Sequence, residues 1–254
     1  MGRIISVVNQ KGGVGKTTTA VNVASYLAHM GKFVLLVDID PQANASSGLG
    51  ADPKKISKGI YEVIIGQENF KDVLLGTEIE GFGLAPASMA LAGANIELVG
   101  HENREFLLHN HLIEAKSNFD YIIIDCPPSL GLLTVNGLVA AQEVLIPVQC
   151  EYYALEGLGQ LLNTINLVKQ NLKPDLDILG AVLTMYDRRN KLSEEVLWEI
   201  HKYFPNKVFR TVIPRNIKLA EAPSHGKPIS LYDRRSKGGR AYEKLSREIL
   251  LTEK

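Results

Sequence analysis

The sequence is poor in the features that mark secreted, membrane-spanning and disulfide-stabilised proteins. It holds two cysteines in 254 residues, Cys126 and Cys150, which argues against a disulfide framework and is typical of a reducing compartment. No apolar run approaches the roughly 18 residues of a transmembrane helix, and the first residues lack the apolar core of a signal peptide. The six histidines form no His-x-x-His or Cys/His spacing, so we expect no transition-metal site. These absences predict a cytoplasmic protein.

The chain also has no net charge, yet its charges are unevenly distributed. The 28 Lys and Arg balance 28 Asp and Glu, but from Met185 to Arg247 there are 15 basic and 7 acidic residues. A local basic excess is the electrostatic footprint expected of a protein that binds phosphate backbones. A solvated basic surface gives the same pattern, and on charge alone that simpler interpretation is favoured.

Short apolar runs rich in Val and Ile alternate with segments of helical periodicity along the whole chain. Nearly continuous apolar runs of this length are typical of strands that are covered on both faces. We predict strands at Ile4–Val8, Phe33–Val37, Tyr121–Ile124, Val144–Val148, Ile178–Leu183 and Val208–Ile213. Strand-then-helix repetition requires crossover connections. The expected fold class is therefore α/β, with a doubly wound, mostly parallel sheet, helices on both faces and a single domain over residues 1–254.

Helical periodicity is clearest just after a glycine-rich loop near the N-terminus. Apolar residues recur there at i, i+3, i+4 and i+7, and Gly31 then follows as a typical C-terminal stop. The apolar positions are Ala20, Val23, Ala24 and Leu27. Similar patterns predict helices at Leu155–Leu172 and Leu192–Tyr203. From Gly48 to Gly100, scattered glycines and small residues leave the assignment open.

The glycine-rich loop follows the first predicted strand directly and contains two lysines. Glycines let the backbone curl so that successive N–H groups point at one anion, and the following helix adds its partial positive charge. In a P-loop, Lys16 would contact the β- and γ-phosphates and the Thr17 hydroxyl would ligate Mg²⁺. The usual pattern has glycine where this chain has Gln10. We predict that ATP is bound by Lys11, Gly12, Gly13, Val14, Gly15, Lys16, Thr17 and Thr18.

Acidic residues follow the second and third predicted strands. Carboxylates at the carboxyl ends of parallel strands face the crevice in which doubly wound sheets bind ligands. Asp125 fits the residue that holds a magnesium-bound water, and Asp40 fits a residue that orients the attacking water. We therefore group Thr17, Asp40 and Asp125 at the magnesium site. Asp38 is explained equally well as a loop cap.

Several motifs, in the correct order, resemble those of the deviant Walker A ATPases, a class that includes ParA, MinD and the nitrogenase iron protein. They are Lys11-Gly-Gly-Val-Gly-Lys-Thr-Thr18, Val37-Asp-Ile-Asp-Pro-Gln42, Ile124-Asp-Cys-Pro-Pro-Ser-Leu-Gly131, Gln149-Cys-Glu-Tyr-Tyr-Ala-Leu-Glu-Gly157, Thr211-Val-Ile-Pro-Arg-Asn216 and Glu221-Ala-Pro-Ser-His-Gly-Lys-Pro228. The match runs essentially from end to end. Within the class, the chain is most similar to the chromosomal ParA branch called Soj.

The resemblance implies an ATP-dependent sandwich dimer that binds double-stranded DNA without sequence specificity at the nucleoid. A ParB-type centromere-binding protein would stimulate its ATP hydrolysis. Lys11 corresponds to the signature lysine that reaches the partner's nucleotide and neutralises transition-state charge. Asp40 corresponds to the residue needed for hydrolysis, and Pro214 and Asn216 to the loop that recognises adenine. The matching DNA-binding positions are Arg189, Lys218, Arg234, Arg235, Lys237 and Arg240.

Other members of the class suggest alternatives. Plasmid relatives often carry an N-terminal helix-turn-helix domain, which we do not expect because the first predicted strand begins near Arg3. A MinD-like membrane-cycling ATPase in division-site placement would need a basic amphipathic tail helix. The tail from Tyr242 to Lys254 has mixed charges and is short, which favours a final helix packed on the sheet and no membrane partner.

Two further classes fit the residues less well. An iron–sulfur electron carrier would need cysteine ligands at the dimer interface, whereas Cys126 and Cys150 are better explained as small buried apolar residues. A DNA-coating protein without enzymatic activity would have no need of Lys16, Thr17, Asp40 and Asp125. The sequence therefore favours a DNA-binding ATPase.

Overall fold

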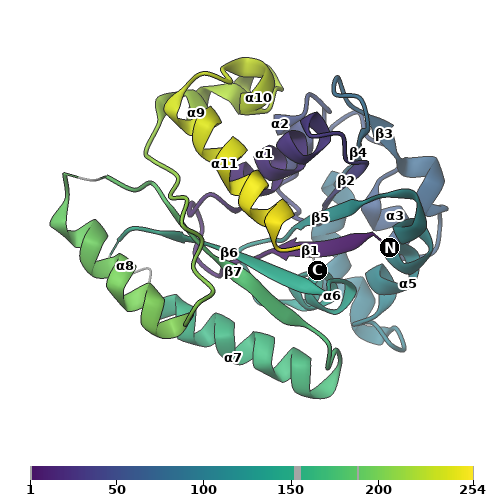
Figure 1. Cartoon of the computed structure of the whole chain (residues 1–254). Helices are drawn as coiled ribbons and strands as arrows, with labels where there is room; N and C mark the ends of the chain where they lie inside the picture. Colours follow the sequence, from purple (N-terminus) through teal and green to yellow (C-terminus); the bar gives the residue numbers. More distant parts are fainter. Residues whose placement is uncertain (1, 152–155, 188, 254) are drawn as a thin grey trace.

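The computed structural model describes residues 2–151, 156–187 and 189–253, and its strands form one seven-stranded sheet (Figure 1). The strand order is β3-β4-β2-β5-β1-β6-β7, in which β3 runs antiparallel to β4 and every other pair is parallel. The strands are β1 (Arg3–Val7), β2 (Val34–Asp38), β3 (Leu75–Gly76), β4 (Phe82–Ala85), β5 (Tyr121–Asp125), β6 (Glu143–Gln149) and β7 (Asp177–Thr184). The α/β class and the mostly parallel sheet are confirmed.

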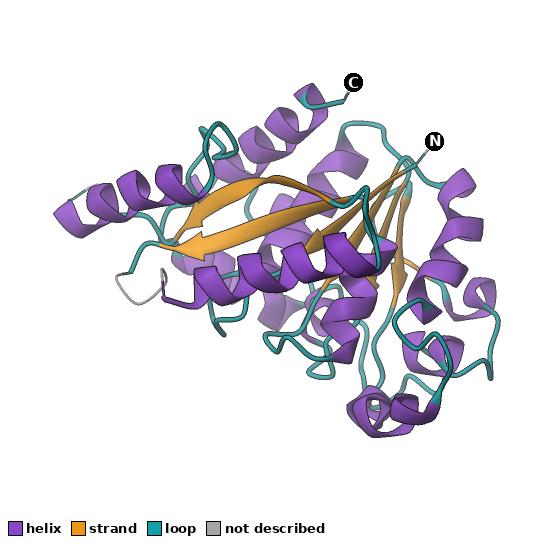
Figure 2. Cartoon of the chain, turned by 90° about the horizontal axis from the view of Figure 1, so that it is seen from below, coloured by secondary structure: helices purple, strands orange, loops and turns teal. Residues whose placement is uncertain are grey.

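Helices cover both faces of this sheet (Figure 2). The longer ones are α1 (Lys16–His29), α5 (Leu107–Ala115), α6 (Leu132–Ala140), α7 (Glu156–Asn171), α8 (Lys191–Tyr203) and α11 (Lys237–Leu251). The short ones are α2 (Asn44–Gly48), α3 (Ile60–Ile64), α4 (Ala94–Glu97), α9 (Ile217–Glu221) and α10 (Ile229–Tyr232). Helix α11 packs against α1 in one layer, whereas α5, α6 and α7 pack together in the other. This is the doubly wound arrangement.

The buried strand β5 explains why the sheet can be covered twice. Its side chains alternate between the two faces, so Ile122 and Ile124 join one buried apolar cluster while Tyr121 and Ile123 join the other. A strand of this kind needs a continuous apolar run, and β5 has one from Tyr121 to Ile124, before Asp125 at its carboxyl end.

The prediction of a strand at Val208–Ile213 is wrong. The segment runs beside β7 and exchanges hydrogen bonds with Ala181, but its pairings are isolated bridges instead of a ladder. Glu248 on α11 accepts hydrogen bonds from the Arg210 amide (2.9 Å) and from the Thr211 hydroxyl. These contacts fall between the segment's hydrogen bonds to Ala181 and to Leu183, so the pairing with β7 is interrupted and no continuous ladder forms.

The other sequence predictions differ from the structure at their margins. The open segment from Gly48 to Gly100 contributes β3 and β4, the latter pairing with β2. Leu155, the predicted start of one helix, lies outside the described residues. Gly31 follows α1 with φ +83°, the left-handed conformation that favours glycine after a helix. Among the helices that the structure describes, none combines the length and apolar character needed to cross a membrane.

Candidate functional site

The glycine-rich loop connects the carboxyl end of β1 to the start of α1, in the middle of the sheet. Gly13 and Gly15 have φ values of +75° and +89°, so both positions favour glycine over residues with side chains. Gly15 is also the N-cap of α1, which puts Lys16, Thr17 and Thr18 in the first turn of that helix. The loop therefore combines curled backbone with a helix N-terminus, as anion binding requires.

Asn9, the residue that opens the loop, holds it in place by two side-chain hydrogen bonds. Asn9 donates its side-chain amide to the Pro147 carbonyl (2.7 Å) and accepts a hydrogen bond from the Lys11 amide (3.0 Å). Pro147 stands inside β6 although proline lacks an N–H for the sheet ladder. The described ladder between β1 and β6 ends at Val7–Leu145, so the proline falls beyond it and beside the loop.

Lys16 is almost completely buried beneath the loop. Its ammonium donates to the Lys11 carbonyl (3.1 Å), and burial lowers its pKa although the carboxylates of Asp125 and Asp40 act in the opposite direction. A buried cation near two carboxylates and the amides of an anion-binding loop fits a phosphate ligand.

Asp125 is the least satisfied polar group of this site. It is fully buried, and in the described part of the chain neither carboxylate oxygen has a hydrogen-bond partner. Burial raises its pKa well above the usual value, the charges of Asp38 and Asp40 add to this effect, and Thr17 and Lys16 oppose it. An unpartnered buried carboxylate beside a threonine hydroxyl fits a Mg²⁺ site, because a divalent cation and its waters would satisfy both oxygens.

Asp38 holds the backbone around Asp40 in place by hydrogen bonds. The two neighbouring strand ends hold Asp38 opposite Asp125. Asp38 accepts hydrogen bonds from the amide and hydroxyl of Ser46 (2.8 and 2.7 Å) and from the Asp40 amide (3.1 Å). The structure therefore supports the loop-cap interpretation for Asp38. Asp40 accepts from the Gln42 amide (2.9 Å) and remains close to Lys16.

A cavity of about 360 Å³ adjoins the glycine-rich loop. Gly15 and Thr18 line it together with Pro214 and Asn216. The Asn216 side chain caps α9 by accepting a hydrogen bond from the Lys218 amide (2.9 Å). The predicted adenine loop thus lies within reach of the predicted phosphate loop, although about 200 residues of sequence separate them.

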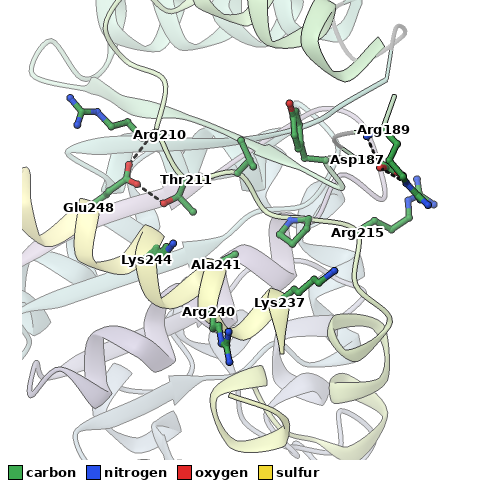
Figure 3. A pocket seen from close by; sticks show the side chains of 13 residues that line it. Asp187, Arg189, Arg210, Thr211, Arg215, Lys237, Arg240, Ala241, Lys244 and Glu248 are labelled. Carbon is green, nitrogen blue, oxygen red and sulfur yellow. Dashed lines mark hydrogen bonds and ion pairs between the residues drawn. The ribbon is translucent and has the colours of Figure 1, made fainter. Parts of the chain in front are cut away.

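A second, basic groove of about 1000 Å³ lies beside this cavity (Figure 3). Three of the predicted DNA-binding residues line it: Arg189, Lys237 and Arg240. Three basic residues that the sequence analysis missed line it as well: Arg210, Arg215 and Lys244. Lys237, Arg240 and Lys244 follow each other at i, i+3 and i+7 along α11, so helical periodicity was the signal that could have revealed Lys244.

The remaining predicted DNA-binding residues are not among those that line the groove. Lys218 pairs with Glu221 (2.8 Å), and Arg234 pairs with Glu243 (3.3 Å). Arg235 is exposed. Arg189 itself is held by both oxygens of Asp187, in an exposed ion pair of 2.7 Å at its closest approach.

In this parallel sheet, β1 leads into a glycine loop that contains a lysine, and a buried aspartate ends the neighbouring strand β5. This combination defines a P-loop nucleotide-binding protein. Residues 2–178 match a protein family described as an AAA domain. The sporulation initiation inhibitor protein Soj of Bacillus subtilis is 55% identical over 98% of both chains. The chromosome-partitioning ATPase Soj of Treponema pallidum is 53% identical, again over 98% of both chains.

A solved structure gives the same picture of the fold. The protein described as cobyrinic acid a,c-diamide synthase from Mycobacterium smegmatis, with bound ADP and magnesium, is 41% identical and superposes with a TM-score of 0.88. The match covers 98% of this chain and 94% of that one. The partitioning proteins share the higher identity over an equal length. The chain belongs to the ParA/Soj family of chromosome-partitioning ATPases.

Proposed function

We propose that this ATPase is an ATP-dependent dimerising switch that binds double-stranded DNA without sequence specificity. A ParB-type centromere-binding protein controls its hydrolysis of ATP, and the protein acts in chromosome segregation, in the cytoplasm and at the nucleoid. The observation that carries the proposal is the shared wall between the two cavities. Pro214 and Arg215 line both the cavity beside the phosphate loop and the basic groove.

In the nucleotide site, Lys16 and the amides of the glycine loop neutralise phosphate charge. Asp40 orients the water that attacks the γ-phosphate. Thr17 and Asp125 would hold magnesium, which supplies further neutralisation of the phosphates when it is bound. The Pro214 loop recognises the base. Buried groups with fixed positions suit this task because they need no reorganisation when charge develops in the transition state.

In the groove, basic side chains outnumber acidic ones. Among the residues that the structure describes, six basic ones line it, against the acidic residues Asp187 and Glu248. Glu248 is already engaged by the Arg210 amide and the Thr211 hydroxyl. Individual attractions between such cations and phosphates are weak, but each releases counterions from the duplex. A dimer presents two such grooves where a monomer presents one, which couples DNA affinity to ATP.

Features of the loop surface support the dimer. Gly12 and Gly13 are exposed, and Lys11 lies partly exposed beside them. This surface leaves room for a second subunit above the phosphates, to which Lys11 would supply a cation.

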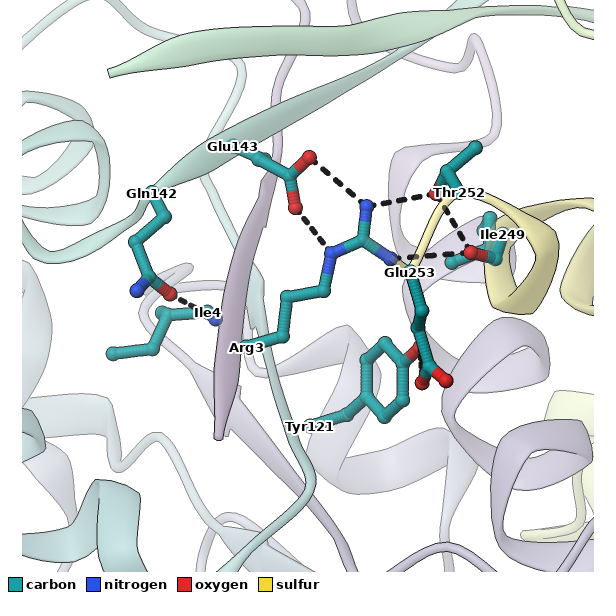
Figure 4. Close-up of polar contacts among 8 residues, drawn as sticks. All are labelled: Arg3, Ile4, Tyr121, Gln142, Glu143, Ile249, Thr252 and Glu253. Atoms are coloured by element: carbon teal, nitrogen blue, oxygen red, sulfur yellow. Dashed lines mark hydrogen bonds and ion pairs between the residues drawn. The ribbon is translucent and has the colours of Figure 1, made fainter. Parts of the chain in front are cut away.

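The MinD-like alternative needs a tail helix whose apolar face is free for a membrane. In this chain, the apolar face of α11 is occupied: Tyr242, Leu245 and Ile249 are buried. Arg3 also ties the last turn of α11 to the sheet (Figure 4). Its guanidinium donates to Glu143 on β6, to the Ile249 carbonyl (3.1 Å) and to the Thr252 hydroxyl (2.8 Å). These hydrogen bonds favour DNA over a membrane surface as the partner.

Titration with random duplex DNA at several salt concentrations tests the proposal. Affinity should rise strongly when ATP replaces ADP, and it should fall steeply with salt. Equal DNA affinity with ATP, with ADP and without nucleotide would contradict the switch. Vesicles of anionic lipid form the second arm, since ATP-dependent binding to them without binding to DNA would favour the membrane-cycling alternative.

A further inference from the structure

A second side-chain hydrogen bond holds the phosphate loop, and it comes from the end of β7. Thr184, the last residue of that strand, is buried, and its hydroxyl donates to the Val14 carbonyl at 2.8 Å. Strand β6 lies between β1 and β7. The bond therefore links the loop to a strand that does not pair with the strand from which the loop emerges.

This bond fixes the orientation of one peptide group in the loop. The Val14 carbonyl and the Gly15 amide belong to the same trans peptide, so they point to opposite sides. Holding the carbonyl at Thr184 directs the Gly15 amide away from β7. Gly15, at φ +89°, adopts the backbone conformation that this orientation needs.

The orientation matters because a phosphate attracts amides and repels carbonyl oxygens. A loop that binds an anion needs N–H groups on its concave side. If the peptide between Val14 and Gly15 turned over, a carbonyl oxygen would replace a donor. The hydrogen bond from Thr184 to the carbonyl disfavours this turn, because turning the peptide over would break that bond.

We propose that Thr184 is a positioning residue for ATP: its hydroxyl orients the Val14–Gly15 peptide for phosphate binding. Asn9 holds the start of the loop and Thr184 holds its middle, so the amides are set before the nucleotide arrives. The inference concerns nucleotide binding within one subunit and does not depend on DNA binding or dimerisation.

Calorimetric titration with Mg-ADP tests this role, because ADP reports on the loop without hydrolysis. Thr184→Val keeps the shape of the side chain but removes the donor, and it should weaken ADP binding on the order of tenfold, as the loss of one such bond implies. Thr184→Ser keeps the hydroxyl and should restore affinity to within about twofold of the native chain. Thermal unfolding without nucleotide establishes that each variant is folded.

A matched control comes from the far edge of the sheet. The Thr77 hydroxyl also donates to a backbone carbonyl, that of Phe82 at 2.9 Å, beside the antiparallel pair of β3 and β4. Thr77→Val should leave ADP affinity unchanged.

Two results would overturn the proposal. One is native ADP affinity in the folded Thr184→Val variant. The other is an equal loss in Thr184→Ser and Thr184→Val, which would assign the effect to the methyl group that Ser lacks. If Thr184→Val does not fold, Thr184→Ala removes the same donor with less bulk, and it is compared with Thr184→Ser by the shift in unfolding temperature on adding Mg-ADP.

Discussion

The ammonium of Lys11 lies 3.1 Å from a carboxylate oxygen of Glu151 in the same chain. Glu151 is itself held by the side chain of Gln149, which donates to its other oxygen at 2.6 Å. The lysine expected to serve a partner's nucleotide therefore has a counterion in its own subunit. Reaching across a dimer requires this ion pair to break.

Glu151→Gln should therefore favour the ATP-bound dimer. Exposed ion pairs contribute about 0.2–1 kcal/mol each, and a symmetric dimer breaks two of them, so the dimer dissociation constant should fall by up to about 30-fold. Sedimentation equilibrium with a non-hydrolysable ATP analogue measures it, and Glu80→Gln, an exposed carboxylate between β3 and β4, controls for the change in charge. Weaker dimerisation in Glu151→Gln would mean that the carboxylate serves the dimer instead.

Gly12→Val should permit ATP binding yet prevent dimerisation. A Cβ at Gly12 meets no atom of the described residues within 4 Å, so the variant should fold and bind nucleotide normally. In a dimer, the branched side chain would crowd the opposing subunit next to Lys11. Calorimetry tests ATP binding and sedimentation tests dimerisation. A stable ATP-dependent dimer of this variant would refute the sandwich geometry.

Asp40→Ala should stop hydrolysis while leaving ATP binding and dimerisation intact, because the carboxylate is proposed to orient the attacking water. Phosphate release should fall by at least about 100-fold, the lower range for loss of a positioned catalytic group. Sedimentation with ATP should then reveal a persistent dimer. A monomer would identify Asp40 as a residue needed for binding or assembly.

Asp125→Asn should stabilise the nucleotide-free protein at neutral pH. Burial raises the pKa of Asp125 in the folded state above its unfolded value. Its contribution to stability is therefore fully present below the unfolded pKa of about 3.9 and is lost as pH rises through the folded pKa. Replacing this unpartnered buried carboxylate by a neutral amide is worth on the order of 1–3 kcal/mol, or several degrees in unfolding temperature.

Thermal unfolding in a chelator at about pH 7 and about pH 4 tests this prediction, and the difference between variant and native protein should shrink at the lower pH. With Mg-ATP the order should reverse, because only the native carboxylate can hold the metal. Equal unfolding temperatures at both pH values would contradict a raised pKa.

Charge removal in the groove should weaken DNA binding equally for unrelated sequences. The double change Arg240→Gln and Lys244→Gln should flatten the salt dependence by about 0.9 for each phosphate that a subunit no longer neutralises. Arg235→Gln is the single-site control for neutralisation, since Arg235 is exposed nearby but does not line the groove. An equally weakened Arg235→Gln would indicate a diffuse basic surface. ATP hydrolysis without DNA should survive in both variants.

The arrangement of the candidate nucleotide site was predictable because its residues are local in the sequence. The glycines, Lys16 and Thr17 are consecutive, and Asp125 follows an apolar run whose carboxyl end must face the same crevice. What the sequence did not reveal depends on distant segments that meet only in the fold. Thr184 and Val14 are 170 positions apart in the sequence, and no periodic pattern predicts a hydrogen bond between them.

The basic groove was only partly predictable for the same reason. Arg210 and Arg215 come from an extended segment, Arg189 from the loop after β7, and Lys244 from α11. Charge counting found the basic region but not which of its cations share a surface. Likewise, the apolar run at Val208–Ile213 looks like a strand until Glu248 takes up the Arg210 amide.

The wall formed by Pro214 and Arg215 has a thermodynamic consequence for the proposed switch. Suppose that contact of Pro214 and Arg215 with a nucleotide raises the affinity of the groove for DNA by some factor. DNA must then raise the affinity for the nucleotide by the same factor, because the two paths to the doubly bound state have equal free energy. A nucleoid would then retain ATP on the protein as well as the protein on DNA. Release from the chromosome would thereby become a step that hydrolysis controls.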